Sequence, residues 1–164
     1  MKNRILCLLL VFALMLGICG MLASCGGDNG GEEEIPVNPE GEAAFTALIE
    51  EFEQMGYTVD WEALEPFFLK GARRVILLND GEVVLNVFIY SSSETSAEDA
   101  SYFTEDGVNY VSDEASIEIA WTYDPHLFLH EQMIILYVGE EPSGVELCTE
   151  MFGEQFAGTP VTAE

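Results

Sequence analysis

The stretch RRVILLNDGEVVLNVFIY, residues 73–90, contains two runs of aliphatic and β-branched residues separated by NDGE at 79–82. Asn, Asp and Gly suit tight turns, whereas Val and Ile favour strands, so the stretch predicts a β-hairpin. Side chains alternate between the two faces of a strand. One face of the second strand is therefore expected to carry Val83, Leu85, Val87 and Ile89, and the other Val84, Asn86, Phe88 and Tyr90.

The segment before this hairpin, residues 42–55, has the pattern of an amphipathic helix. Apolar residues recur at intervals of three and four, acids take the opposite side, and Gly56 is expected to end the helix. The apolar stripe consists of Phe45, Leu48, Ile49, Phe52 and Met55. Residues 57–70 hold several large apolar side chains around Pro66, which predicts a packed irregular segment with a short strand at 57–59.

After the hairpin, the pattern of helix and strands recurs. Residues 96–103, SAEDASYF, predict a short helix capped by Ser96, with acids in its first turn. SIEIAWTY at 116–123 alternates like a strand, and MIILYV at 133–138 is a continuous apolar run typical of a central strand. These two runs are interpreted as a second hairpin.

A last helix is expected to end at Gly153. Ser143 and Glu146 have the S-x-x-E spacing of a capping box at its start. The order helix, hairpin, helix, hairpin, helix predicts an α+β domain over residues 43–160, with a mainly antiparallel sheet of four or five strands and helices on one face. Such a domain is long enough for one core. Its expected members include Phe52, Leu85, Ile135 and Phe156, with Cys148 as a buried, inert thiol.

The N-terminus has the form of a secretory signal. Lys2 and Arg4 precede an uncharged apolar run at 5–24. LASC at 22–25 resembles the lipobox of bacterial lipoproteins, in which the cysteine thiol receives diacylglycerol and the signal is cut just before it. Residues 1–24 are thus predicted as a signal peptide and Cys25 as the lipidated residue. The run is also long enough to be an uncleaved membrane helix, which is the rival interpretation.

Residues 25–42 are rich in Gly, Glu, Asp, Asn and Pro, a composition that predicts a flexible tether. All 30 acidic residues follow Cys25, and loss of the signal leaves three cations, so the mature chain carries about −27. A nucleic-acid partner is excluded by this charge, and membrane attachment is expected through the diacylglyceryl lipid alone, on the outer face of a bacterial membrane. Cys148 is then the last thiol available, and no intramolecular disulfide can form.

Two groups of residues are candidates for binding. Lys70, Arg73 and Arg74 are close in sequence and are either neutralising partners of nearby carboxylates or a contact for an anion or a partner protein. His126 and His130 have the i, i+4 spacing of two metal ligands on a helix. Pro125 and the local alternation favour turn and strand instead, so a structural His126 and an exposed His130 are preferred.

The sequence contains no G-x-S-x-G, P-loop or G-x-G-x-x-G motif, and no cofactor is predicted. We therefore expect a binding or interaction module for an envelope protein or a small ligand. The alternative is an envelope enzyme, hydrolase-like, whose polar residues meet only in three dimensions. A deep pocket with His126 and two or more buried carboxylates would favour the enzyme.

Residues 124–158 resemble the C-terminal part of a set of small bacterial lipoproteins of unknown activity. The resemblance rests on a Pro-His-aromatic turn at 125–128, an IVLYVG-like strand at 134–139 and G-x-QFAG at 153–158. The first hairpin is also similar. The chain departs from the pattern at residues 130–133, HEQM, where the family has a basic KKGRL hairpin tip. The resemblance implies a similar fold and location. It carries over no activity, because none is established for the family.

Overall fold

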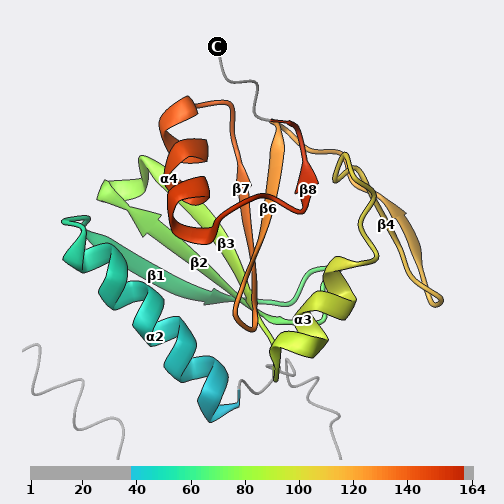
Figure 1. Ribbon diagram of the computed structural model, residues 1–164, viewed down its shortest axis with the longest axis horizontal. Coiled ribbons are helices and arrows are strands. Elements are labelled where there is room, and N and C mark those ends of the chain that lie inside the picture. Colours follow the sequence, from blue (N-terminus) through green and yellow to red (C-terminus); the bar gives the residue numbers. More distant parts are fainter. Residues whose placement is uncertain (1–37, 161–164) are drawn as a thin grey trace, which may run out of the picture. The chain divides into compact units, whose positions relative to one another are not determined.

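The structure is a computed structural model that describes residues 38–160 (Figure 1). The predicted signal peptide, Cys25 and most of the predicted tether lie outside the described residues. The described part contains three α-helices, a six-stranded antiparallel sheet and a separate pair of short strands. This arrangement confirms the α+β class.

The elements follow one another from α2 to β8. In chain order they are α2 (Pro39–Gln54), β1 (Val59–Leu64), β2 (Ala72–Leu78), β3 (Val83–Ile89), α3 (Ser93–Ala100), β4 (Asn109–Val111), β5 (Ser116–Glu118), β6 (Pro125–His130), β7 (Met133–Val138), α4 (Pro142–Phe152) and β8 (Ala157–Gly158). The large sheet has the strand order β1-β2-β3-β7-β6-β8.

The first predicted hairpin is confirmed as β2 and β3. Leu78 pairs with Val83 across the turn, and Asn79, Asp80 and Gly81 all have positive φ. Asn, Asp and Gly tolerate this backbone region better than other residues, which explains why the reversal occurs at this point. The two faces of β3 are also as predicted, because Leu85 and Phe88 lie in different cores.

The second predicted hairpin was wrong in one of its two strands. The central strand β7 pairs with β3 and with β6, whereas Ser116–Glu118 pairs with β4 in the two-stranded sheet. Pro125 had suggested a turn, but it is the first residue of β6, a place where a strand tolerates the missing N–H. The reversal between β6 and β7 uses Glu131, which has a φ of 51°.

The sheet has six strands rather than the expected four or five. β8 adds two residues at one edge and pairs with β6. β1 forms the other edge and pairs with β2 over its whole length, from Val59 to Leu64. The prediction of an irregular segment beginning at residue 57 was therefore wrong for this part, although residues 65–71 do contain no helix or strand.

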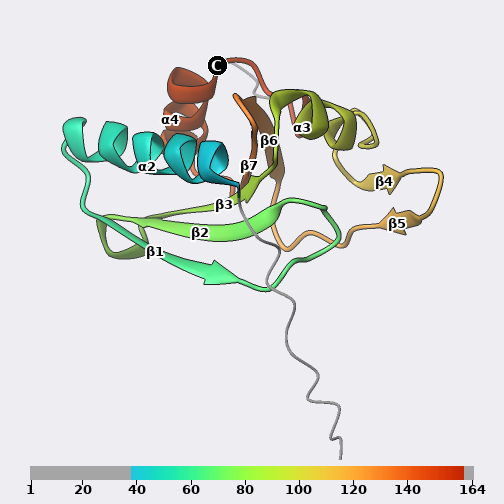
Figure 2. The ribbon, with the colours of Figure 1, turned by 90° about the horizontal axis from the view of Figure 1, so that it is seen from below.

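Two hydrophobic cores lie on opposite faces of the large sheet. Helices α2 and α4 cover the first core, which includes Phe52, Ile135 and Cys148. The second core includes Ala100 of α3 and Tyr110 of β4. In Figure 2, β6 and β7 lie between α4 and α3. The expectation that all helices share one face was therefore wrong for α3.

The helix starts differ from the predicted ones. α2 begins at Pro39 with Asn38 as its N-cap, so the predicted tether boundary at residue 42 was too late. Ser92 rather than Ser96 caps α3, and its side chain accepts a hydrogen bond from the Thr95 N–H. Helix α4 begins after Glu141 without a side-chain cap, so the predicted capping box at Ser143 and Glu146 does not form.

The predicted core residues are largely confirmed. Phe52, Leu85, Ile135 and Cys148 are fully buried, whereas Phe156 is partly buried against the second core. Burial raises the pKa of the Cys148 thiol to about 12, which makes it poorly nucleophilic at neutral pH, as expected. No helix within residues 38–160 has the length and apolar character needed to cross a bilayer.

Candidate functional site

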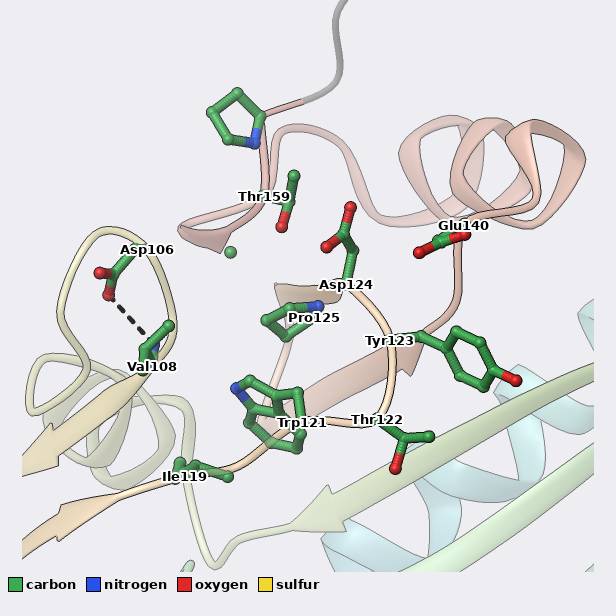
Figure 3. Close-up of a pocket in the computed structure, with 12 residues that line it drawn as sticks. Asp106, Val108, Ile119, Trp121, Thr122, Tyr123, Asp124, Pro125, Glu140 and Thr159 are labelled. Atoms are coloured by element: carbon green, nitrogen blue, oxygen red, sulfur yellow. Dashed lines mark hydrogen bonds between the residues drawn. The ribbon is translucent and has the colours of Figure 1, made fainter.

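An open pocket of about 480 Å³ lies beside the β8 edge of the large sheet (Figure 3). This volume is in the range that accommodates a small molecule or a few peptide side chains. Residues from four separate parts of the chain form it. The lining comprises Asp106, Val108, Ile119, Trp121, Thr122, Tyr123, Asp124, Pro125, Glu140, Gly158, Thr159 and Pro160.

Hydrogen bonds fix the walls of this pocket. The Trp121 indole N–H donates to the Gly107 carbonyl at 2.9 Å, which orients the ring. Gly107 itself has a φ of 69°, and an added Cβ there would meet Leu127 and Gly158 at 3.0–3.1 Å. The loop before β4 therefore packs closely against β6 and β8. On the other wall, the Gly139 N–H donates to the Asp124 carbonyl, which holds the start of β6 beside the end of β7.

The pocket is negatively charged. It carries the carboxylates of Asp106, Asp124 and Glu140, and Asp106 and Glu140 lie on opposite sides of it in Figure 3. The Thr104 hydroxyl and the Val108 N–H donate to the Asp106 carboxylate at 2.6 and 3.0 Å and hold its pKa below the ordinary value. Asp106 is consequently ionised at neutral pH.

The lining contains no Lys, Arg, His, Cys or Ser, as its twelve residues show. It therefore lacks an internal counter-ion for the three carboxylates and a nucleophile paired with a base. Within residues 38–160, no three His, Cys, Asp or Glu side chains come close enough together to hold a metal ion. Tyr123, which is 57 % exposed, adds an aromatic surface beside the acids. Carboxylates next to aromatic rings suit an organic cation.

The three cations of the predicted cluster do not converge. Arg73 and Arg74 are adjacent in β2, so their side chains point to opposite faces of the sheet. Arg73 donates to the Asn86 carbonyl Oδ1 at 2.7 Å, and Arg74 forms an ion pair with Glu42 at 3.0 Å. Lys70 lies in the loop before β2, with its ammonium 6.0 Å from the Tyr102 ring centroid.

Each of the two arginines also packs against an aromatic ring. The Arg73 guanidinium lies 5.7 Å from the Phe67 ring centroid, and that of Arg74 lies 5.7 Å from the Trp61 ring centroid. The neutralising role is thus visible for Arg74, whereas a shared anion contact for all three residues would need them on one face. Binding of an anion or a partner by any one of them stays a prediction.

The two histidines lie on β6, on one face but four residues apart. At the rise of a strand this spacing separates them by about 13 Å, too far for one metal ion to bridge. His126 is buried, stacks on Tyr137 and shares a 2.9 Å hydrogen bond with Gln155 Oε1. Because that oxygen only accepts, the His126 Nδ1 is the donor in this hydrogen bond. His130 is partly buried against Phe152 rather than exposed.

Sequence reasoning missed a buried polar cluster around Asp99 of α3. Its carboxylate accepts hydrogen bonds from the Tyr90 and Tyr110 hydroxyls, both at 2.6 Å, and from the Lys70 N–H at 3.0 Å. Burial, followed by the bond to Asp99, raises the pKa of both tyrosines, so their hydroxyls stay protonated. The cluster joins the residue after β3, helix α3, strand β4 and the loop before β2, so its role is structural.

The sequence offers little signal for this cluster. Asp99 is one of many acids in the chain, and its partners lie 9, 11 and 29 residues away. The apolar setting of Tyr90 at the end of β3 was visible, because alternation placed it beside Phe88. Its hydroxyl then needed a buried partner, but the alternation could not say which acid would supply it.

Gln155 and Gly158 hold the residues around β8 against the start of β6. Gln155 bonds His126 on one side and donates to the Thr159 carbonyl at 2.8 Å on the other. Gly158 lies so close to Pro125 that a Cβ on Gly158 would overlap the Pro125 carbonyl oxygen.

Comparisons with models of protein families, with curated proteins and with solved structures found no match.

Proposed function

We propose that this chain is a lipid-anchored, extracytoplasmic binding module whose pocket receives a cationic group of its ligand. The observation that carries the binding role is the pocket at the β8 edge, which combines three carboxylates with two aromatic side chains and contains no basic residue. A ligand ammonium or guanidinium would supply the missing positive charge. The aromatic side chains would then pack against its apolar part.

The proposed location rests on the sequence of residues 1–25. A basic start, an apolar run and LASC before the acids together match a lipoprotein signal, and the resemblance of residues 124–158 to small lipoproteins agrees with it. A mature chain of about −27 would be repelled by anionic headgroups, so the diacylglyceryl chains on Cys25 would provide the attachment. The proposed site is the outer face of a bacterial membrane.

Binding is favoured over catalysis by the surroundings of the polar residues. A deep pocket with His126 and buried carboxylates would have supported an enzyme, but His126 bonds Gln155 and does not line the pocket. Asp99 is buried but already accepts three hydrogen bonds in the second core. The pocket carboxylates belong to Asp106, Asp124 and Glu140. None of these three residues is buried.

The lipid anchor is tested by mass spectrometry of the full-length chain expressed in a bacterial host. We expect the N-terminal fragment to begin at a diacylglyceryl-modified Cys25, and Cys25→Ser to abolish the modification and membrane retention. Recovery of an intact segment 1–24 in the membrane fraction would contradict the proposal and support a membrane helix.

The pocket is tested by tryptophan fluorescence on the full-length chain in a non-ionic detergent. Trp61 and Trp121 are the two tryptophans of the sequence, so a Trp61→Phe background leaves Trp121 as the reporter in the pocket. Arginine amide and tetramethylammonium serve as probes, with glycerol and acetate as neutral and anionic controls. We expect a saturable change with the two cations and none with the controls.

A matched pair of variants separates the pocket from the overall charge. Asp124→Asn with Glu140→Gln should weaken cation binding by about tenfold or more. Glu50→Gln with Glu53→Gln removes the same charge from exposed positions of α2 and should leave binding unchanged. Equal losses in both pairs would mean that the cations follow net charge, and the proposed site would be wrong.

A further inference from the structure

The β1 edge of the large sheet is much more exposed than the rest of it. β1 pairs with β2 through all six of its residues, yet Asp60, Trp61, Glu62 and Ala63 are all exposed. The strand therefore has a regular backbone and little burial. An edge strand of this kind presents a row of N–H and C=O groups that a further strand can pair with.

The two edges of the sheet differ in their capacity to pair. β8 has two residues, includes Gly158 with a φ of 118° and is followed at once by Thr159 and Pro160. β1 is longer, has an unbroken register with β2 and contains no proline or glycine within residues 59–64. Bulges, prolines and very short strands protect many edges, and β1 has none of them. Its protection is the charge of Asp60 and Glu62, which opposes acidic strands but not basic ones.

The side chains of β1 give this edge a definite chemistry. Asp60 and Glu62 project on one face, opposite Leu77 and Val75 of β2. Trp61 projects on the other face, is 49 % exposed and packs edge-on against Phe45 with ring centroids 5.3 Å apart. A strand added here would meet two carboxylates at alternate positions on one face and an indole on the other.

These features select the occupant. A second copy of this chain would bring acids against acids, and like charges directly opposite one another destabilise a strand pair. Lysine or arginine at alternate positions of an added strand would instead face Asp60 and Glu62, while an apolar residue between them would face the Trp61 side. The net charge of the chain would also attract a basic segment.

We propose that the β1 edge binds an extended, basic segment of a partner protein by adding it to the sheet as a further strand. The inference is independent of the proposed pocket, because β1 and β8 are the two outer strands of the sheet. Backbone pairing would provide the affinity, and the alternation of basic and apolar side chains would provide the specificity.

The probe is an acetylated and amidated heptapeptide with lysine at every odd position and threonine or valine between. Hydrogen exchange of the full-length chain in non-ionic detergent is followed with and without it. We expect slower exchange of the outward-facing amides of β1 and no change in β7. A control peptide has proline at every position between the lysines. It keeps the charge but cannot pair as a strand, so it should bind about tenfold more weakly.

Charge reversal supplies the variant test. Asp60→Lys with Glu62→Lys should abolish binding of the lysine peptide and create binding of the corresponding glutamate peptide, which shows that the variant is folded. Glu50→Lys with Glu53→Lys makes the same change in net charge on α2 and should retain lysine-peptide binding. The pocket pair Asp124→Asn and Glu140→Gln should also retain it.

Three results would overturn the inference. Equal binding of the proline peptide would reduce the interaction to charge alone. Equal losses in the β1 and α2 reversals would remove the role of Asp60 and Glu62. Loss of peptide binding in the pocket pair, with β1 unprotected in the wild type, would assign the basic segment to the pocket instead.

Discussion

Strands β7 and β1 are both six residues long and belong to the same sheet, but their surroundings are opposite. Met133 to Tyr137 of β7 are all buried, with side chains in both cores, whereas no residue of β1 is buried. β7 is held by packing on two faces, and β1 mainly by its pairing with β2. The comparison indicates that most of the stability resides in the centre of the sheet and little of it in the β1 edge, where we propose that a partner binds.

The largest expected effect is at the centre. Ile135→Ala in β7 should lower the free energy of unfolding by about 2–5 kcal/mol, because it leaves a cavity in a fully buried site. Asp60→Ala in β1 should change it by less than about 0.5 kcal/mol. Urea unfolding of both variants measures the contrast. Similar losses at the two positions would break the comparison.

The next effect concerns the cluster that ties the second core together. Asp99→Ala leaves the Tyr90 and Tyr110 hydroxyls and the Lys70 N–H without their acceptor, at a net cost of about 1–3 kcal/mol. Asp99→Asn keeps an acceptor oxygen and should cost less. Thermal unfolding ranks the two variants. If they are equally stable, the three donors find other partners and the cluster is not a tie.

Alkaline pH should also lower the free energy of unfolding, through groups buried in the two cores. The pKa of Cys148 rises from an ordinary 9.0 to about 12 in the folded chain, so between these values the unfolded state binds fewer protons and stability falls as pH rises. Tyr90 and Tyr110 act in the same direction at higher pH, because their pKa values are also raised.

The variant Cys148→Ala isolates the thiol. It should be less stable at neutral pH because of the lost side chain, but its stability should fall less steeply above about pH 9, by up to about 1.4 kcal/mol per pH unit. Urea midpoints between about pH 8 and pH 10.5 provide the measurement. Parallel pH profiles for the two proteins would show that Cys148 does not titrate differently on unfolding.

The smallest effect separates the two arginines of β2. Arg74→Gln removes an ion pair with Glu42 and a contact with Trp61, so it should destabilise the chain by up to about 1 kcal/mol, with a smaller loss at high salt. Arg73→Gln removes hydrogen bonds to the neutral Asn86 and should depend less on salt. The same salt dependence for both would suggest one shared electrostatic environment.

The parts of the fold that local pattern describes could be predicted from the sequence. The β2–β3 turn depends on Asn79, Asp80 and Gly81, and the apolar run of β7 has no plausible place except a sheet centre. β6 was missed because Pro125 indicates a turn when its neighbours are unknown. The face chosen by α3 depends on Asp99 and its distant partners.

The pocket was beyond prediction for a different reason. Its lining comes from residues 106–108, 119–125, 140 and 158–160, and each piece alone looks like an ordinary acidic or aromatic loop. The sequence could not show that these pieces meet. The basic cluster was misjudged because Lys70, Arg73 and Arg74 are close in sequence, although adjacent residues of a strand lie on opposite faces.

The pairing of β3 with β7 also has a consequence for how the chain folds. The hairpins β2–β3 and β6–β7 form between neighbours in sequence, whereas β3 and β7 meet only after residues 90–132 have closed into a loop. Such long-range pairing is slow, although its entropic cost grows little with loop length. Until the two hairpins meet, each carries an unpaired edge that is apolar on both faces and can join another chain. The rate at which β3 finds β7 therefore sets how long a newly made molecule is prone to aggregation.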